Sequence, residues 1–104
     1  MSESTTRDQL SVALEHARRA VNIDKEGIDM TAAIIAYGQS VAILSSVIEE
    51  LRKELSEAPQ EKRIQMEQDV IKVVEIHNSY RDRMFLLSEA TGIPIPSSVR
   101  RPLL

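Results

Sequence analysis

Apolar residues recur along most of the chain at a spacing of three and four, which is the pattern of amphipathic helices. The densest stretch is Ala33 to Leu44, and its main apolar stripe continues from Met30 to Leu55. Further apolar side chains thicken the flank of this stripe, so the segment is apolar on more than one face. Such a helix needs two neighbours. The pattern therefore predicts a middle helix over residues 30–56, with one helix before it and one after it.

The segment before the middle helix carries a face of small side chains. Its apolar positions are Leu10, Ala13, Leu14, Ala17, Ala20 and Val21. Alanine on a helix face lets a neighbouring helix approach more closely than leucine would. Gly27 then suits the left-handed position that ends a helix, and Asp29 suits the N-cap of the next helix. We therefore expect a first helix over residues 6–26.

The segment after Pro59 contains a long apolar seam. The seam consists of Met66, Val70, Val73, His77, Tyr80, Met84 and Leu87. A second, weaker stripe beside it consists of Ile71, Val74, Asn78, Arg81 and Phe85. The spacing predicts a third helix over residues 61–91, which Gly92 ends. The prolines that follow push their neighbours into extended conformations, so residues 92–104 are expected to form an extended tail or linker.

Together these elements predict an all-α fold, a three-helix antiparallel bundle with up-down-up topology over residues 1–91. A chain of 104 residues is long enough to form one such domain with a buried core. Pro59, Gly92 and the later prolines all lie outside the helical patterns, so the chain is expected to be nearly all helix. Patterns typical of strands are missing. We therefore expect a single helical domain followed by a short tail.

Composition argues against several classes of function. The net charge of -3 and the pI near 5.4 disfavour a nucleic-acid-binding domain, which gathers a surplus of Lys and Arg on one face. The aromatic residues Tyr37, Tyr80 and Phe85 are too few for a base-stacking platform. The chain has no cysteine, which removes disulfides and thiolate metal ligands. Its uninterrupted apolar runs are short, so we expect no signal peptide and no direct membrane insertion.

Candidate catalytic or metal-binding chemistry is sparse. His16 and His77 lie on different predicted helices, and neither belongs to an HExxH-type pair. His77 falls on the apolar seam, where a buried histidine satisfied by one hydrogen bond is expected. The sequence has no glycine-rich phosphate loop and no nucleophile elbow. We therefore predict no metal, no cofactor, no catalytic residue and no enzymatic activity.

Three patterns, taken in order, carry a resemblance to a known family. They are Leu14-Glu-His-Ala17-Arg-Arg-Ala20-Val21-Asn-Ile-Asp24-Lys25-Glu-Gly27, then Ala33-x-x-x-Tyr37-x-x-Ser40-Val41-x-x-Leu44, then Tyr80-Arg-Asp-Arg83-x-x-x-Leu87. Over about residues 8–90 they resemble the microtubule-interacting and transport (MIT) domain. The resemblance implies a non-catalytic protein-interaction adaptor that binds short motifs in the C-terminal tails of ESCRT-III subunits. Such an adaptor is cytoplasmic and is recruited peripherally to endosomal or other remodelled membranes in vesicle transport.

The resemblance also implies two grooves for ligands. A groove between the second and third helices would take a helical ligand, and its predicted lining is Ile43, Val47, Ile71, Val74, Asn78, Arg81, Asp82 and Phe85. A groove between the first and third helices would take an extended, proline-containing ligand, and its predicted lining is Ala13, Ala17, Ile76 and Arg83. A further hypothesis is that residues 93–96 fold back and occupy a groove in place of a ligand.

Asp24 is placed unfavourably in its helix, because a carboxylate in the last turn faces the negative end of the helix dipole. A cationic partner is therefore expected. In the bundle that the resemblance implies, the C-terminal ends of the first and third helices lie together, so we predict an ion pair between Asp24 and Arg83.

The main alternative to a peptide-binding adaptor is a structural or oligomerising bundle. It would bury the second stripe of the third helix in a homodimer. Between these two hypotheses the sequence favours an adaptor that is a monomer.

Overall fold

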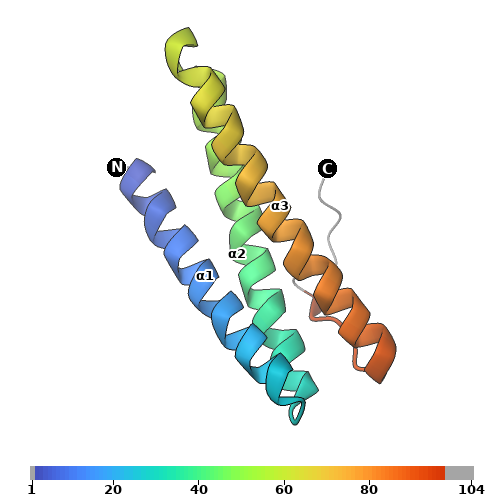
Figure 1. The fold of residues 1–104 in the computed structure, drawn as a ribbon. Helices are drawn as coiled ribbons and strands as arrows, with labels where there is room; N and C mark the ends of the chain where they lie inside the picture. Colours follow the sequence, from blue (N-terminus) through green and yellow to red (C-terminus); the bar gives the residue numbers. More distant parts are fainter. Residues whose placement is uncertain (1, 98–104) are drawn as a thin grey trace.

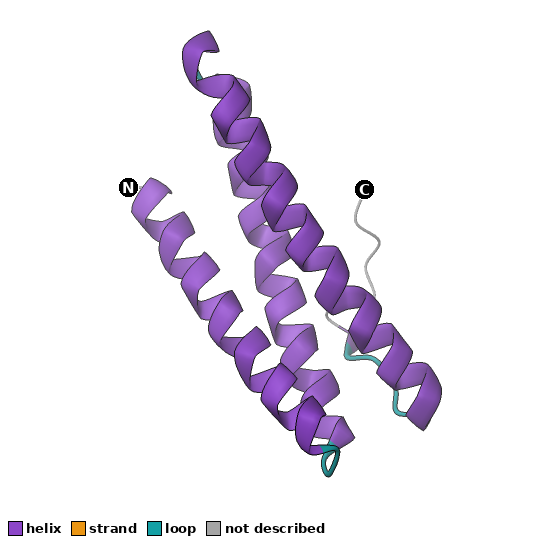
Figure 2. Ribbon diagram, in the orientation of Figure 1, coloured by secondary structure: helices purple, strands orange, loops and turns teal. Residues whose placement is uncertain are grey.

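The computed structural model describes residues 2–97 of the chain, with their side chains from Thr6 onward. It contains three helices, α1 (Ser2–Glu26), α2 (Met30–Glu57) and α3 (Gln60–Thr91). Each helix runs antiparallel to the one before it, in an elongated bundle of 48 × 24 × 19 Å (Figure 1). Figure 2 shows only helices and connecting segments in this part of the chain. The predicted all-α, three-helix antiparallel bundle is confirmed.

Local sequence explains where the helices begin and end. Gly27 and Gly92 adopt the left-handed conformation that other residues avoid, with φ of 70° and 77°. The carboxylate of Asp29 caps α2, because it accepts a 3.0 Å hydrogen bond from the backbone N–H three residues further on. α2 and α3 match the predicted ranges to within one residue. α1 begins at Ser2 rather than near residue 6, since the polar lead contains no proline or glycine to stop it.

The core lies along α2. One buried cluster, near the turn between α1 and α2, is formed by Ala20, Ala33, Ile34, Ala36, Tyr37, Met84 and Leu87. A second cluster further along α2 is formed by Ala13, Leu44, Val47, Ile48 and Val73. α2 packs extensively against both α1 and α3, whereas those two helices have little close backbone contact with each other. The predicted middle helix with two apolar faces is therefore confirmed.

Within the described residues, α2 is the one helix whose length and composition would allow it to cross a membrane. In the bundle, 56% of its most apolar window is buried. The core helix of a globular domain has the same profile, so this is a weak indication of membrane insertion. The length of uninterrupted apolar runs is a poor guide to whether a helix could cross a membrane. A few small polar residues interrupt the runs in α2 but leave the helix apolar on average.

Small side chains bring α1 and α2 close together. Ala13, Ala17 and Ala20 are at most 1% exposed. At this α1–α2 contact, the Ser40 hydroxyl of α2 donates a buried 2.8 Å hydrogen bond to the backbone carbonyl of Ala13. A short serine side chain reaches the backbone of another helix only where the two helices approach closely. The alanine face is therefore the α1–α2 interface.

The segment after α3 folds back onto the bundle. The Ser88 hydroxyl donates a 2.5 Å hydrogen bond to the Ile93 carbonyl, and Ile93 N–H donates to the Thr91 hydroxyl. Ile93 and Ile95 pack against the core cluster that contains Tyr37. Figures 1 and 2 show this segment turning back from the end of α3 toward α2. Residues 93–96 thus form a docked tail, and residues 98–104 of the predicted tail lie outside the described residues.

Candidate functional site

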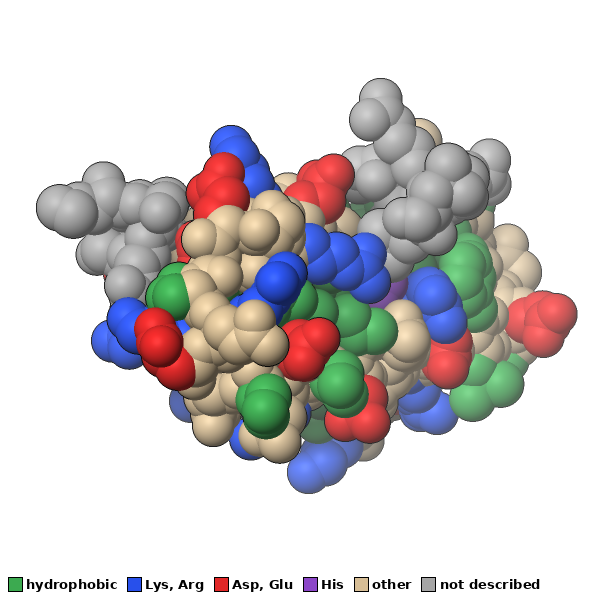
Figure 3. Space-filling model, turned by 90° about the horizontal axis from the view of Figure 1, so that it is seen from above, with side chains coloured by type: hydrophobic (Ala, Val, Ile, Leu, Met, Phe, Trp, Pro, Cys, Tyr) green, Lys and Arg blue, Asp and Glu red, His purple; other side chains and the backbone are tan. Residues whose placement is uncertain are grey.

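A large recess lies between the first half of α1 and the first half of α3, with the end of α2 as its floor. It has a volume of about 660 Å³, which is in the range of ligand-binding pockets. We call it the α1–α3 cleft. Its lining is Thr6, Arg7, Leu10, Leu14, Leu51, Glu54, Ala58, Pro59, Lys62, Met66, Asp69, Val70, Lys72, Val73 and Ile76. Figure 3 looks down on this end of the bundle and shows hydrophobic side chains between basic and acidic ones.

The cleft exists because α1 packs on α2 and leaves the start of α3 uncovered. From α1 it receives Leu10 and Leu14, and Leu14 remains 39% exposed. On α3 the lining runs from Lys62 to Ile76, which at 1.5 Å per residue is a length of about 21 Å. The cleft is therefore an elongated trough along α3 rather than a round pocket.

Charged side chains surround the apolar floor of the cleft. Glu54 accepts a 3.4 Å hydrogen bond from Thr6, and Asp69 accepts a 3.0 Å hydrogen bond from Gln65. The cationic lining residues are Arg7, Lys62 and Lys72. None of these three cations is among the ion pairs formed by the described residues. The acidic lining thus has hydrogen-bond partners within the bundle, whereas the cationic lining forms no ion pair among the described residues.

The four residues predicted to line the groove between α1 and α3 do not share one surface in the structure. Ile76 does line the α1–α3 cleft. Ala13 and Ala17 are buried against α2 at 0% and 1% exposure, so they present no side chain to a ligand. Arg83 lies seven residues beyond Ile76, about 10 Å further along α3, and it takes part in an ion pair instead. The prediction is wrong for Ala13 and Ala17, because the alanine face turns toward α2. Arg83 is exposed and faces Asp24 of α1, so its role in binding a ligand stays a prediction.

The predicted groove between α2 and α3 is only partly open. Val47 is fully buried, which corrects its prediction as a lining residue. Ile43 and Val74 are partly buried against the same core cluster. Ile71 and Phe85 are 56% and 44% exposed, so they are the large apolar side chains of this set that reach the surface.

The polar members of the same predicted groove interact with neighbours on α3. Asn78 is half-buried and contacts the ring of His77. Arg81 and Asp82 form an ion pair of 3.2 Å with each other. Because these side chains lie between Ile71 and Phe85 along the helix, they divide the exposed apolar surface into separate parts.

His77 is the one buried histidine of the described chain, with 1% exposure. Its Nδ1 lies 2.9 Å from Asn78 Oδ1, and its Nε2 lies 3.1 Å from the Ser45 hydroxyl of α2. The Ser45 hydroxyl also donates a 3.1 Å hydrogen bond to the Val41 carbonyl, which ties the contact to the backbone of α2. Burial lowers the pKa of His77, although the hydrogen bond with Asn78 opposes this shift. The burial predicted from the position of His77 on the seam is confirmed. Its ring contacts Asn78 on α3 and Ser45 on α2, whereas one hydrogen bond was expected.

An ionic network joins all three helices at the end opposite the cleft. Arg83 Nε and Nη2 donate hydrogen bonds of 2.7 and 2.8 Å to the two carboxylate oxygens of Asp24, and the Tyr37 hydroxyl donates one of 2.8 Å. The bond from Arg83 lowers the pKa of Asp24, while burial opposes it. Burial and the bond to Asp24 raise the pKa of Tyr37. The Asp24–Arg83 pair that we predicted is present.

The described residues contain no group of three or more His, Asp or Glu side chains that would hold a metal ion. Each buried side-chain nitrogen or oxygen in residues 6–97 has a hydrogen-bond partner. No orphaned polar atom therefore marks a position for an absent ligand. What the site offers chemically is an apolar floor with charged edges.

Sequence reasoning missed most of the cleft lining. Leu10 and Leu14 were assigned to helix packing, and Met66, Val70 and Val73 to the core seam. The sequence patterns made no prediction for the charged residues of the lining. One signal was available, because α1 changes from leucine in its first half to alanine in its second half. Small side chains hold one end of a helix pair together, and larger side chains hold the other end apart.

No family model, curated protein or solved structure matches the chain. The resemblance to MIT domains accordingly rests on the sequence patterns alone.

Proposed function

We propose that the protein is a non-catalytic adaptor that binds short peptide segments in the α1–α3 cleft. The observation that carries this proposal is the cleft itself, an apolar trough of about 660 Å³ with charged edges. Such a surface accepts the apolar side chains of a peptide, and the charged edges orient it. Leu14 is a natural contact, because it lines the cleft and is already partly exposed.

The partner class that we propose is the C-terminal tail of ESCRT-III subunits. This part rests on the three MIT-like sequence patterns. The Asp24–Arg83 pair supports it, since the bundle that the resemblance implies brings these two residues together. On this proposal the adaptor is cytoplasmic and acts at endosomal or other remodelled membranes.

A second candidate surface is the side of α3 that carries Ile71 and Phe85. These two side chains are about half exposed, which favours contact with a helical peptide or with a second copy of the chain. The apolar surface here is broken by the Arg81–Asp82 pair. The α1–α3 cleft is therefore the better candidate for the peptide-binding site.

The test is a titration of ¹⁵N-labelled protein with a set of ESCRT-III tail peptides. We expect saturable amide shifts at the cleft residues of α1 and α3. Leu14→Asp should abolish them, because it places a charge on the apolar floor. Val12→Asp is the matched control, since Val12 is also an exposed apolar residue of α1 but lies outside the cleft.

Different outcomes would reject different parts of the proposal. If Val12→Asp weakens binding as much as Leu14→Asp, the cleft is not the site. Shifts centred on Ile71 and Phe85 would move the site to the second candidate surface. If no tail peptide binds at all, ESCRT-III subunits are not the partners.

A further inference from the structure

The charge of the cleft differs in sign from the charge of the whole chain. The chain carries a net charge of -3, yet the cleft lining contains three cations and two carboxylates. Both carboxylates, Glu54 and Asp69, accept hydrogen bonds from neighbouring side chains. The lining itself therefore carries a net charge of +1, which favours an anionic partner within the cleft of a protein whose overall charge would repel it.

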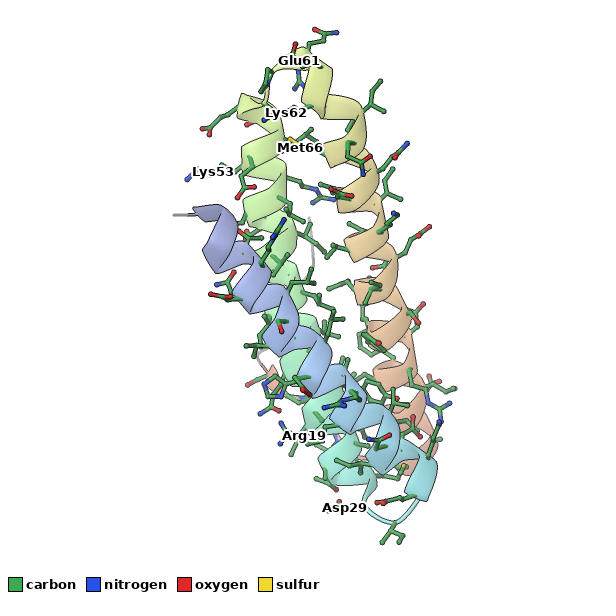
Figure 4. The ribbon with its side chains drawn as sticks, turned by 60° about the vertical axis from the view of Figure 1, so that its left-hand side comes forward. Arg19, Asp29, Lys53, Glu61, Lys62 and Met66 are labelled. Atoms are coloured by element: carbon green, nitrogen blue, oxygen red, sulfur yellow. The ribbon has the colours of Figure 1, made fainter. Side chains whose placement is uncertain are left out.

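The cations stand on both sides of the apolar floor. Arg7 belongs to α1, whereas Lys62 and Lys72 belong to α3. In Figure 4, Lys62 and Met66 lie at the same end of the bundle, near the end of α2. A ligand in the trough would have basic side chains along both of its edges and apolar side chains beneath it.

The dimensions of the cleft suit one face of a helix. A helix with its side chains is about 10 Å across and about 21 Å long over 14 residues. A trough of about 660 Å³ is too small for a whole helix but receives the apolar side chains of one face. Since α1 and α3 leave this position open, a docked helix would complete a four-helix arrangement around α2.

We propose that the α1–α3 cleft selects acidic amphipathic helices, with apolar side chains on the docking face and Asp or Glu along both edges. This inference rests on the proposed peptide-binding function and specifies the chemistry of the partner. It differs from the extended, proline-containing ligand that the sequence resemblance implies for the groove between α1 and α3.

The test uses three synthetic helical peptides of about 16 residues with the same leucine positions at i, i+4, i+7 and i+11. Their edge positions carry Glu, Gln or Lys. Binding to the full chain is measured by calorimetry and by amide shifts. We expect the Glu peptide to bind about tenfold or more tightly than the Gln peptide, and the Lys peptide to bind most weakly. Higher salt should remove most of this preference, because the edges are exposed.

Charge reversal of the protein provides the reciprocal test. The triple variant Arg7→Glu, Lys62→Glu and Lys72→Glu should prefer the Lys peptide. All three positions are exposed, so the fold should tolerate the change, and circular dichroism checks it. The single variant Lys62→Glu should also weaken binding of the Glu peptide. Its matched control is Lys53→Glu, because Lys53 is an exposed lysine of α2 outside the cleft lining (Figure 4).

The outcomes distinguish the preference for acidic helices from peptide binding in the α1–α3 cleft, on which that preference rests. If the Glu and Gln peptides bind equally well and Leu14→Asp still abolishes binding, the preference for acid is wrong and the peptide-binding cleft stands. If the Lys53→Glu control weakens binding as much as Lys62→Glu, the attraction is due to net charge alone and the inference fails. If no peptide binds in the cleft, both the inference and the proposed site are rejected.

Discussion

Asp24 connects the three helices at the end of the bundle opposite the cleft. Its side chain is 10% exposed and accepts hydrogen bonds from Tyr37 of α2 and Arg83 of α3. Asp24→Asn keeps an acceptor for Tyr37 but loses the charge-assisted bonds to Arg83. We expect it to lower the free energy of unfolding by about 1 kcal/mol, a modest value because Arg83 is 45% exposed. Urea unfolding measures the change.

Asp82→Asn is the matched control for this substitution, because Asp82 pairs with Arg81 but is 69% exposed. It should change stability by only a few tenths of a kcal/mol. Equal effects of the two variants would contradict a special role for Asp24.

The carboxylate of Asp24 also makes the stability of the bundle depend on pH in the acidic range. The pKa of Asp24 is lowered in the folded state, so the unfolded chain binds the proton more readily. The contribution of Asp24 to stability is therefore complete above its unfolded pKa of about 3.9 and is lost as pH falls through the folded value. The stability difference between the wild-type protein and Asp24→Asn should accordingly shrink when urea unfolding is repeated below about pH 4. A constant difference down to low pH would refute this.

From the burial of His77 we expect a second effect of pH on stability, in a higher pH range than that of Asp24. Burial lowers its pKa in the folded state, so the unfolded chain takes up the proton first, near its usual value of about 6.5. The free energy of unfolding should therefore fall as pH decreases from about 7 to about 5. His77→Gln, which retains hydrogen-bonding groups, should flatten this part of the profile. A wild-type profile that is flat over this range would contradict the prediction.

These two residues show why single contacts were accessible from sequence. Asp24 stands in a helix turn where a carboxylate needs a cation, and His77 stands in an apolar seam where an imidazole must be buried. In both cases the local position restricts what the side chain can do. The contact between His77 and Ser45 depends on how α2 and α3 are rotated against each other, which no local pattern specifies.

At the scale of elements, the alanine face of α1 sets its distance from α2. Ala17 is 1% exposed and leaves no room for a larger side chain. Ala17→Leu should lower the free energy of unfolding by about 1–3 kcal/mol, because overpacking forces the helices apart. Thermal unfolding measures the loss. Val12→Leu on the exposed face should have little effect, and a comparable loss in that control would contradict the packing argument.

The tail after α3 is a small element that contributes to stability. Ile93 and Ile95 are partly buried against the Tyr37 cluster. Replacing both with serine should cost about 1–2 kcal/mol, since each loses part of the transfer free energy of a buried side chain. Thermal unfolding of the double variant checks this. Pro94→Ser is the control at an exposed position between them, and it should leave stability nearly unchanged.

The elements themselves were largely predictable, and their terminal segments were less so. Periodicity located all three helices, and glycine located two of their ends. The start of α1 was missed because nothing in the polar lead either requires or forbids a helix. The docking of the tail was only a hypothesis, because proline predicts an extended conformation but not the surface on which an extended segment lies.

At the scale of the whole molecule, the cleft is a property of the arrangement and not of any one segment. Leu14 and Met66 lie far apart in sequence, and their joint exposure follows from α1 packing on α2 and away from the start of α3. Periodicity identifies apolar faces but not which parts of them remain uncovered. The family resemblance accordingly implied a groove between α1 and α3 with Ile76 in its lining, but it also placed Ala13, Ala17 and Arg83 there.

The exposed apolar side chains of α3 raise the question of a homodimer, which is the alternative to a peptide-binding adaptor. Ile71 and Phe85 are about half exposed, but Arg81 and Asp82 divide them. A stable dimer buries roughly 800 Å² on each partner, usually as a continuous apolar area. We therefore expect a monomer of 11.7 kDa by light scattering across a range of concentrations. A mass that rises toward twice this value, and returns to the monomer value in Phe85→Glu, would instead establish the dimer and assign this side of α3 to a second copy of the chain.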